Sequence, residues 1–488
     1  MSLGMMALVA ILLPVVGAFA VWALGRWPNA REGATLLTAT SLFGLVYAMF
    51  GQVMAGGIAS YDIVEVVPGV TLGLEVEPLG MVFALVASFL WIVTSLYAIG
   101  YMRGHHEENQ TRFFFFFAIA IGGAMGVAFS ANLFTLFAFY EVLTLCTFPL
   151  VTHHGTEAAR KAGRVYLGIL LTTSVAFQLL AIIWTWELAG TVDFRPGGIL
   201  AGTASKGVLS VLLVLFVFGV GKAAVMPFHR WLPAAMVAPT PVSALLHAVA
   251  VVKAGVFTIL KVSVYVFGLD LLATLSTTPW LAWAAAATIL LGSLVAFTKD
   301  NLKARLAYST ISQLSYIVLG ALLANEMGII GGGMHIAMHA FGKITLFFAA
   351  GAIMVAAHET EISRMRGLGR TMPLTFAAFF IGSLSIIGVP PAGGAWSKWF
   401  LGLGTLEAGQ LGLLATLMVS SLLSLVYLLE IPVRAFFSKP PADAHHHEGI
   451  HEAPWPSLVA IVITALATLA LFVWPDPFYD LMTMVVAR

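Results

Sequence analysis

Long apolar stretches separated by short polar segments make up almost the whole chain. A transmembrane helix needs about 20 consecutive apolar residues, and the pattern predicts fourteen such spans. We place them at residues 3–25, 34–55, 78–100, 113–130, 132–152, 164–187, 207–226, 240–267, 279–298, 303–324, 328–356, 373–400, 410–437 and 457–475. The chain is therefore expected to be an all-α polytopic membrane protein.

One polar segment, between the second and third spans, has a different pattern. Residues 61–70 alternate apolar and polar side chains around Pro68 and Gly69. Alternation around such a turn pair is typical of two short antiparallel strands. The sequence thus predicts a small hairpin on the membrane surface.

Prolines and glycines interrupt the seventh and twelfth spans, at residues 226–233 and 388–394. Proline removes a backbone donor, and in lipid a broken helix survives only inside a bundle or beside a wet cavity. The breaks lie five spans apart, and paired interruptions indicate inverted repeats. We expect an N-terminal three-helix segment with the hairpin, a first five-helix repeat, a second one, and a cytoplasmic loop with the last helix. These parts cover residues 1–112, 113–267, 268–437 and 438–488.

The composition agrees with a membrane location. Of the 488 residues, 60% are hydrophobic and only 10% are charged, whereas soluble domains carry about 25% charged residues. No basic run suggests a nucleic-acid partner. Cys146 is the only cysteine, which excludes an internal disulfide and a Cys-ligated cluster within the chain. The first apolar run is too long for a cleaved signal core, so we take it as the first span.

Basic residues are distributed unevenly between the loops. Sixteen lie on loops that join odd to even spans: Arg26, Arg31, Arg103, Arg112, Arg160, Lys161, Arg164, Arg230, Lys299, Lys303, Arg305, Arg364, Arg366, Arg370, Arg434 and Lys439. Four lie on the other side: Arg195, Lys206, Lys261 and Arg488. By the positive-inside rule, the odd-to-even loops are cytoplasmic and both termini are outside. The expected location is the inner (plasma) membrane of a prokaryotic cell.

Five charged residues fall inside apolar spans. They are Glu141, Lys222, Lys253, Lys343 and Lys398. A charge at the centre of a span costs roughly 2.5–3.5 kcal/mol on insertion scales, so such residues usually face a wet interior and mark an ion or proton path. All four cations are lysines, which lose a proton when buried far more readily than arginine does. The approach of a carboxylate such as Glu141 would restore the charged form.

Span eleven carries three titratable residues in register. His335, His339 and Lys343 are spaced by four residues, so they stack along one helix face. Histidine titrates near neutrality, which suits a proton relay. A metal site and a histidine satisfied at a helix interface remain alternatives; the metal site would need a third ligand, which this helix does not offer. His247 on span eight is a further candidate.

Other polar clusters lie in loops. The segments with His105, His106, Glu107 and Glu108, and with His445, His446, His447, Glu448 and His451, are interpreted as solvated linkers. No phosphate-binding glycine loop is present at a strand-to-helix junction, so nothing indicates ATP hydrolysis. We expect no metal and no cofactor in this chain.

Several ordered motifs resemble one family. They are Phe139, Tyr140 and Glu141; Gly221 and Lys222 followed by residues 227–233; residues 238–247, which end at His247; Leu306, Ala307, Tyr308, Ser309 and Thr310 with Ser312 and Gln313; and residues 335–343. Over nearly the full chain the sequence resembles the antiporter-like subunits shared by respiratory complex I, Mrp-type cation/proton antiporters and group 4 membrane-bound hydrogenases.

The resemblance implies roles for the buried residues. Glu141 would be the coupling carboxylate, Lys222 its partner in the first half-channel, Lys253 the connecting lysine and Lys398 the terminal lysine of the second half-channel. His335, His339 and Lys343 would form a central hydrated axis, with His247 and Lys303 in supporting positions. Asn301 stands where family members commonly have an aspartate, so no acidic role is carried over there.

The resulting hypothesis is a proton-translocating subunit of a multi-subunit membrane complex. Its partners would be other membrane subunits of a complex I-like, Mrp or hydrogenase assembly, with protons, and Na⁺ left open as a second ion. It would not be catalytic alone, although its complex could be an NADH:quinone oxidoreductase or a hydrogenase. The alternatives are Na⁺/H⁺ exchange within an Mrp-type antiporter, a stand-alone solute transporter, and a haem or quinone redox enzyme.

Overall fold

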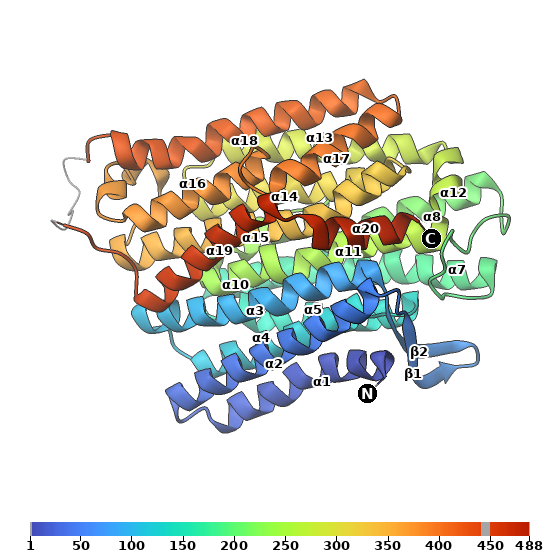
Figure 1. Ribbon diagram of the computed structural model, residues 1–488, viewed down its shortest axis with the longest axis horizontal. Helices are drawn as coiled ribbons and strands as arrows, with labels where there is room; N and C mark the ends of the chain where they lie inside the picture. Colours follow the sequence, from blue (N-terminus) through green and yellow to red (C-terminus); the bar gives the residue numbers. More distant parts are fainter. Residues whose placement is uncertain (1, 441–448, 488) are drawn as a thin grey trace.

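Long helices run side by side along the whole molecule, and helices joined by tight connections, such as α1 and α2, run in opposite directions (Figure 1). The computed structural model describes residues 2–440 and 449–487. His445, His446, His447 and Glu448 of the predicted histidine-rich linker lie outside the described residues. The N- and C-terminal ends both lie toward the end of the bundle that carries the hairpin (Figure 1).

Most of the helical elements follow each other with short connections, and longer segments follow α7, α15 and α18. The helices are α1 (Leu3–Ala23), α2 (Pro28–Met54), α3 (Pro78–Gly104), α4 (Gln110–Ala128), α5 (Leu133–Val151), α6 (Glu157–Thr173), α7 (Leu180–Ala189), α8 (Lys206–Gly219), α9 (Trp231–Ala234), α10 (Thr240–Ala244), α11 (Val251–Val262), α12 (Leu269–Thr274), α13 (Thr277–Thr298), α14 (Leu302–Leu322), α15 (Glu326–Ala357), α16 (Pro373–Ile387), α17 (Gly394–Glu407), α18 (Leu411–Phe437), α19 (Trp455–Val473) and α20 (Asp476–Val486). Short π-helical segments are η1 (Ser174–Leu179), η4 (Leu245–Val249) and η5 (Ser263–Phe267). Short 3₁₀ turns are η2 (Gly221–Ala223), η3 (Ala235–Val237), η6 (Ile362–Arg364) and η7 (Leu368–Arg370).

Within the described residues, eleven helical segments are long and apolar enough to cross a membrane. Two of them contain π-helical turns, at residues 157–189 and 240–267. The chain is thus a polytopic, predominantly helical membrane protein. Segment 240–267 and α15 are among the most enclosed, whereas α1, α2, α13, α18 and α19 have broad exposed apolar faces.

The hairpin predicted from the sequence is present and longer than expected. Strands β1 (Ala59–Val67) and β2 (Val70–Val76) pair antiparallel around Gly69, whose φ of +81° favours glycine at the turn. β1 is largely exposed, while Leu74 and Val76 of β2 are fully buried. The hairpin therefore covers the ends of the first helices at this end of the bundle.

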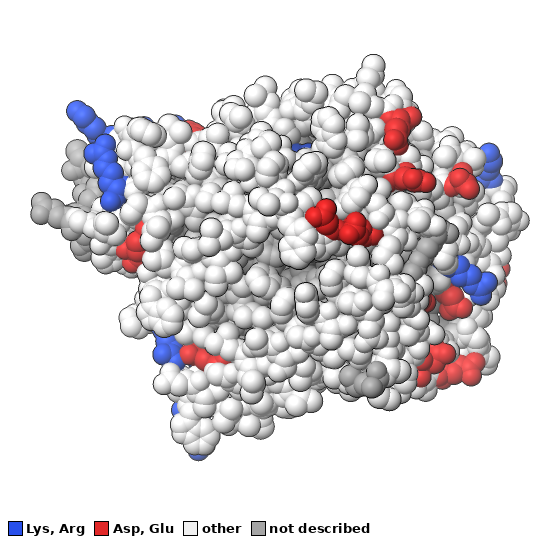
Figure 2. Space-filling model, in the orientation of Figure 1, with Lys and Arg blue, Asp and Glu red and all other residues white. Residues whose placement is uncertain are grey.

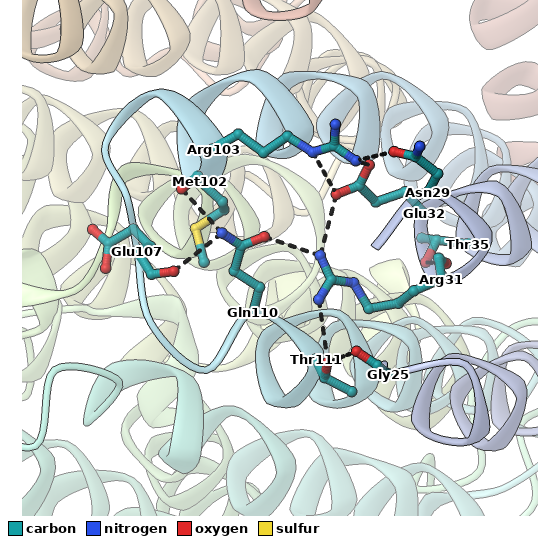
Figure 3. Close-up of polar contacts among 10 residues, drawn as sticks. All are labelled: Gly25, Asn29, Arg31, Glu32, Thr35, Met102, Arg103, Glu107, Gln110 and Thr111. Atoms are coloured by element: carbon teal, nitrogen blue, oxygen red, sulfur yellow. Dashed lines mark hydrogen bonds and ion pairs between the residues drawn. The ribbon is translucent and has the colours of Figure 1, made fainter. Parts of the chain in front are cut away.

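The opposite end is joined by an ion-pair network (Figure 3). Glu32 of α2 accepts hydrogen bonds from Arg31 at 3.2 Å and from Arg103 of α3 at 3.0 Å. Arg31 also donates to Gln110 and Thr111 of α4, at 2.9 and 3.2 Å. Because Arg31 and Glu32 are each only 4% exposed, this network ties three helices together.

The visible face of the molecule has a broad band almost free of charge (Figure 2). Lys and Arg side chains gather at the left, where the odd-to-even loops lie, and Asp and Glu side chains are frequent at the right (Figures 1 and 2). This is the distribution expected of a protein whose middle lies in lipid.

One lysine lies elsewhere than the sequence predicts. Lys261 is not beyond a span but inside α11, 1% exposed, with its Nζ 3.4 Å from Glu77 Oε1 and 2.7 Å from the Ser130 carbonyl. Glu77 also accepts from the backbone N–H groups of Leu79 and Gly80, both at 2.8 Å, at the start of α3. The helix-capping carboxylate stabilises the buried ammonium, which the apolar pattern alone does not reveal.

Replacing Glu77 by Gln should lower the free energy of unfolding by about 3–5 kcal/mol, because it leaves Lys261 as an uncompensated buried charge. Arg195→Gln is the matched control, since Arg195 and Asp193 form a surface pair at 3.9 Å with 62% and 48% of their side chains exposed. That pair should contribute less than about 1 kcal/mol. Thermal unfolding of the purified complex measures both, and equal shifts would contradict the role of Glu77.

Candidate functional site

The first broken helix ends earlier than its prolines suggest. α8 ends at Gly219, so Lys222 lies in the break itself, within η2, and Ala224 adopts a left-handed φ of 55°. Trp231 Nε1 donates to the Gly221 carbonyl at 2.9 Å, and Met226 N donates to Thr288 Oγ1 at 3.2 Å. Side chains of neighbouring elements thus satisfy the backbone groups that the break frees.

Lys222 is fully buried and reaches across to α5. Its Nζ donates to the Tyr140 carbonyl at 2.8 Å and to Thr144 Oγ1 at 2.5 Å, and lies 3.1 Å from the centre of the Tyr140 ring. The adjacent Glu141 has two buried carboxylate oxygens without a hydrogen-bond partner among the described residues. A carbonyl, a hydroxyl and the face of an aromatic ring thus stabilise the lysine. Glu141 lies on the same helix as these groups, but its carboxylate makes no hydrogen bond to another described residue.

The centre of the protein contains a lysine–histidine contact. Lys253 Nζ of α11 lies 2.6 Å from His339 Nδ1 of α15, and both residues are buried. An ammonium donates only to a nitrogen with a free lone pair. The contact therefore requires a free lone pair on one of the two nitrogens, and it breaks if Lys253 is an ammonium and Nδ1 also carries a proton.

His335 lies one turn from His339, with ring centres 5.8 Å apart. Its Nδ1 is 2.8 Å from Ser397 Oγ of α17, and its Nε2 is 3.1 Å from Gln313 Oε1 of α14. Because an amide oxygen only accepts, Nε2–H donates to Gln313, whereas Nδ1 faces a hydroxyl that can donate or accept. His335 thus connects α15 to both helices through groups that donate and accept.

Lys343 continues the same helix face. Its Nζ donates to Ser309 Oγ at 2.8 Å, and Tyr427 OH donates to the same Ser309 oxygen at 3.0 Å. His247 packs against Phe347, with ring centres 4.7 Å apart, and neither of its nitrogens has a hydrogen-bond partner among the described residues.

Lys398 lies in α17, just after the second break. Its Nζ donates to the carbonyls of Ile386 and Ile387, at 2.8 and 3.1 Å, where α16 ends. It also donates to Ser421 Oγ at 3.0 Å and lies 4.5 Å from the Tyr316 ring centre. A cation at a helix C-terminus is favourably placed, so the lysine satisfies the freed carbonyls. It also borders a surface groove of about 670 Å³.

The structure places some of the site residues predicted from the sequence in contact and keeps others apart. Lys253, His339 and His335 form one contiguous centre, with Lys343 a turn further along α15. Lys222 lies apart from this centre, in contact with the helix α5 that also carries Glu141. Lys303 donates to the Ala238 carbonyl at 2.6 Å.

Sequence reasoning missed Gln313, Ser397 and Tyr427 as partners of the titratable residues. Their signal in the sequence is weak, because hydroxyl and amide side chains are common in membrane helices.

No group of three His, Cys, Asp or Glu side chains within residues 2–440 and 449–487 is arranged to hold a metal ion. The two histidines of α15 instead contact an ammonium, a hydroxyl and an amide.

Comparison with known proteins matches residues 130–424 to the family described as NADH:quinone oxidoreductase/Mrp antiporter, TM. The chain belongs to this family. Residues 68–114 match the N-terminus of NADH-ubiquinone oxidoreductase (complex I) chain 5.

Relatives of this family come from several kinds of complex. NADH-quinone oxidoreductase subunit N of Desulforudis audaxviator is 34% identical over 75% of this chain and 73% of its own length. Subunit L of the same kind of oxidoreductase, from Mycobacterium tuberculosis, is 30% identical over 93% and 73%. A component of a probable K(+)/H(+) antiporter of Rhizobium meliloti is 31% identical over 91% of this chain, which spans 45% of that longer protein.

Two solved structures have the same fold. A chain of the Mrp complex from Dietzia sp. superposes with a TM-score of 0.87 at 22% identity, covering 100% of this chain and 97% of that one. A chain of the membrane-bound sulfane sulfur reductase, an archaeal respiratory membrane complex, superposes with a TM-score of 0.87 at 25% identity, covering 99% and 97%. Both neighbours are parts of membrane complexes.

The packing between α11 and the first break yields a test. A Cβ added at Gly255 would collide with the backbone of Lys222 and Ala223, so Gly255→Ala should push these elements apart and lower stability by about 1–3 kcal/mol. Gly168→Ala in α6 is the control, because nothing lies within 4 Å of its added Cβ. Thermal unfolding and proton-transfer assays of the two variants check this, and an unaffected Gly255 variant would refute the close approach.

Proposed function

We propose that this chain is a proton-translocating subunit of a larger membrane complex, with protons moving along the buried Glu, Lys and His residues. The contact that carries the proposal is the one between Lys253 and His339, at 2.6 Å. Two titratable groups that share one proton in a buried contact are suited to pass it on when the local field changes.

A route along α15 would use groups that both donate and accept. His335 is flanked by Ser397 and Gln313, and Lys343 by Ser309. A hydroxyl exchanges donor for acceptor by rotation, so it accommodates either protonation state of its neighbour. The 5.8 Å between the rings of His335 and His339 is a distance that one bridging water spans.

Coupling to the rest of a complex would begin at Glu141 and Lys222. Because the Glu141 oxygens have no hydrogen-bond partner among the described residues, this carboxylate is free to change its distance from the ammonium. At about 4 Å and an effective dielectric of about 20, the attraction between two unit charges is about 4 kcal/mol, enough to change which protonation state of the lysine is favoured.

We further propose fourteen spans arranged in the two repeats 113–267 and 268–437. The eleven long apolar segments would be completed by α8, by α14 and by the pair α16 and α17. The two breaks that end α8 and α16 occupy corresponding places in the repeats, which supports an inverted duplication. The concentration of basic residues on odd-to-even loops supports a cytoplasmic position for them, with both termini outside.

The relatives belong to quinone oxidoreductases and to a probable K(+)/H(+) antiporter. They suggest two energy sources that could drive protons along the proposed path. Redox reactions elsewhere in a complex would drive protons outward, or a cation gradient would be exchanged for protons. The proposed proton path is common to both.

Lys222→Ala and Glu141→Gln should each abolish proton movement while the complex still assembles, because one removes the titrating group and the other its switching charge. Lys206→Ala, at an exposed lysine at the start of α8, is the control. Acidification of vesicles that contain the purified complex, followed with a pH-sensitive dye, measures the effect. Full activity of either variant would reject the proposal.

A further inference from the structure

The loop after α3 contains a titratable cluster that the proposed path does not use. Glu107 is in contact with three imidazoles: His105 at 2.9 Å, His154 at 3.6 Å and His153 at 3.9 Å. The Glu107 carboxylate points away from the network of Arg31, Glu32 and Arg103 (Figure 3). The solvated linker predicted here therefore has a buried carboxylate in its middle.

The members of this cluster differ in exposure. The side chains of His105 and His154 are 33% and 35% exposed, whereas those of Glu107 and His153 are 6% and 2% exposed. Burial, and then the charge of Arg112, lower the pKa of His153. Two imidazoles thus face water and one carboxylate lies behind them.

The surroundings of the cluster include charged groups of other helices. Glu107 and His247 both lie within electrostatic range of Lys303, whose Nζ donates to the Ala238 carbonyl at 2.6 Å. The titratable groups in contact with Glu107 are His105, His153 and His154, and Tyr101 and Lys303 lie within its electrostatic range. Arg112 lies beside His153 and donates to its backbone carbonyl at 2.6 Å.

We propose that His105, His154 and Glu107 form a proton-collecting site on the face of the odd-to-even loops. A proton from water binds an exposed imidazole nitrogen, and then leaves it for a Glu107 oxygen as the imidazole regains its lone pair. From there it supplies the proposed proton path inside the bundle. The inference rests on the proposed function, because it names where protons are exchanged with water.

Glu107→Gln tests the site, because an amide does not accept the proton. Proton uptake by vesicles with the purified complex should slow about tenfold at pH 8.5, where protons are scarce and local focusing matters most. At pH 6 the rate should stay within about twofold of wild type, since bulk protons then suffice. Glu108→Gln is the matched control, because the neighbouring carboxylate is exposed.

A second variant keeps the test decisive if Glu107→Gln fails to assemble. His105→Asn combined with His154→Asn removes only the two exposed imidazoles and should show the same dependence on pH. If proton uptake by this double variant were slowed equally at all pH values, or not slowed at all, the collecting site would be overturned. If Lys222→Ala were active as well, the proposed function itself would fail; if only the Glu107 variants behave as wild type, the collecting site alone fails.

A separate observation concerns the last helix. Asp476 is exposed and Asp480 half-buried on α20, and no ion pair joins either carboxylate to another described residue. Acidic side chains are visible over this helix in the middle of the pale band (Figure 2).

The depth of these carboxylates follows from their neighbours. Trp474 and Phe478, which flank Asp476 in sequence, line an apolar groove of about 240 Å³ together with Phe89 and Phe341. Phe89 and Phe341 lie near the middles of α3 and α15. The middle of a 27-residue helix such as α3 is roughly 20 Å from either end, inside the hydrocarbon core of a bilayer.

Lipid cannot cover such a surface, since a carboxylate at this depth has no water and no partner. The geometry points to a protein interface: the face of α20 with Asp476 and Asp480 binds a transmembrane helix of another protein of the complex that carries Lys or Arg at mid-depth. The adjoining groove, rich in aromatic side chains, would receive apolar side chains of the same helix.

Charge reversal in the native complex tests the interface. Asp476→Lys should release one membrane protein from the purified complex in native electrophoresis, whereas Asp270→Lys, at an exposed acid on α12, should not. A photo-crosslinking residue at Pro477 should join this chain to a span of that protein that contains Lys or Arg. Crosslinks only to lipid, to a second copy or to another segment of this chain, or full assembly with Lys in place of the aspartate, would overturn the interface.

Discussion

Lipid offers no hydrogen bonds, and this constraint determines where the charges inside the bundle lie. Every backbone group freed by a broken helix needs a partner inside the bundle. At the first break Trp231 and Thr288 supply partners, and at the second Lys398 donates to the carbonyls that end α16. The breaks are therefore polar points in an apolar interior, and Lys222 and Lys398 lie at them.

The buried and half-buried charges fall into two groups with different partners. Glu32 with Arg31, Glu77 with Lys261, and Arg305 with Glu430 are ion pairs, at 3.2, 3.4 and 2.9 Å. Removing one member leaves an unpaired charge, so these pairs hold helices in place.

Lys222, Lys253, Lys343 and Lys398 contact hydroxyls, carbonyls, an imidazole and aromatic rings, and none forms an ion pair with another described residue. Neutral partners of this kind are compatible with both the charged and the neutral form of a lysine. The difference separates the charges that stabilise the fold from those that we propose carry protons. Neutral surroundings of the four lysines also fit a family with members in different kinds of complex. Such surroundings allow a lysine to respond to a change in the local electric field, whichever reaction causes that change.

The hydrophobic pattern by itself determined the class of protein, the hairpin, the positions of both breaks and the burial of Lys222, Lys253 and Lys343, because a lipid environment restricts each span to a long apolar helix. It could not place Lys261, which the fold buries against Glu77. Nor could it show that Lys253 meets His339, 86 positions further along the chain, or that Glu107 lies behind two exposed histidines. Those contacts join separate helices and loops, and only tertiary packing decides which of many polar side chains face each other.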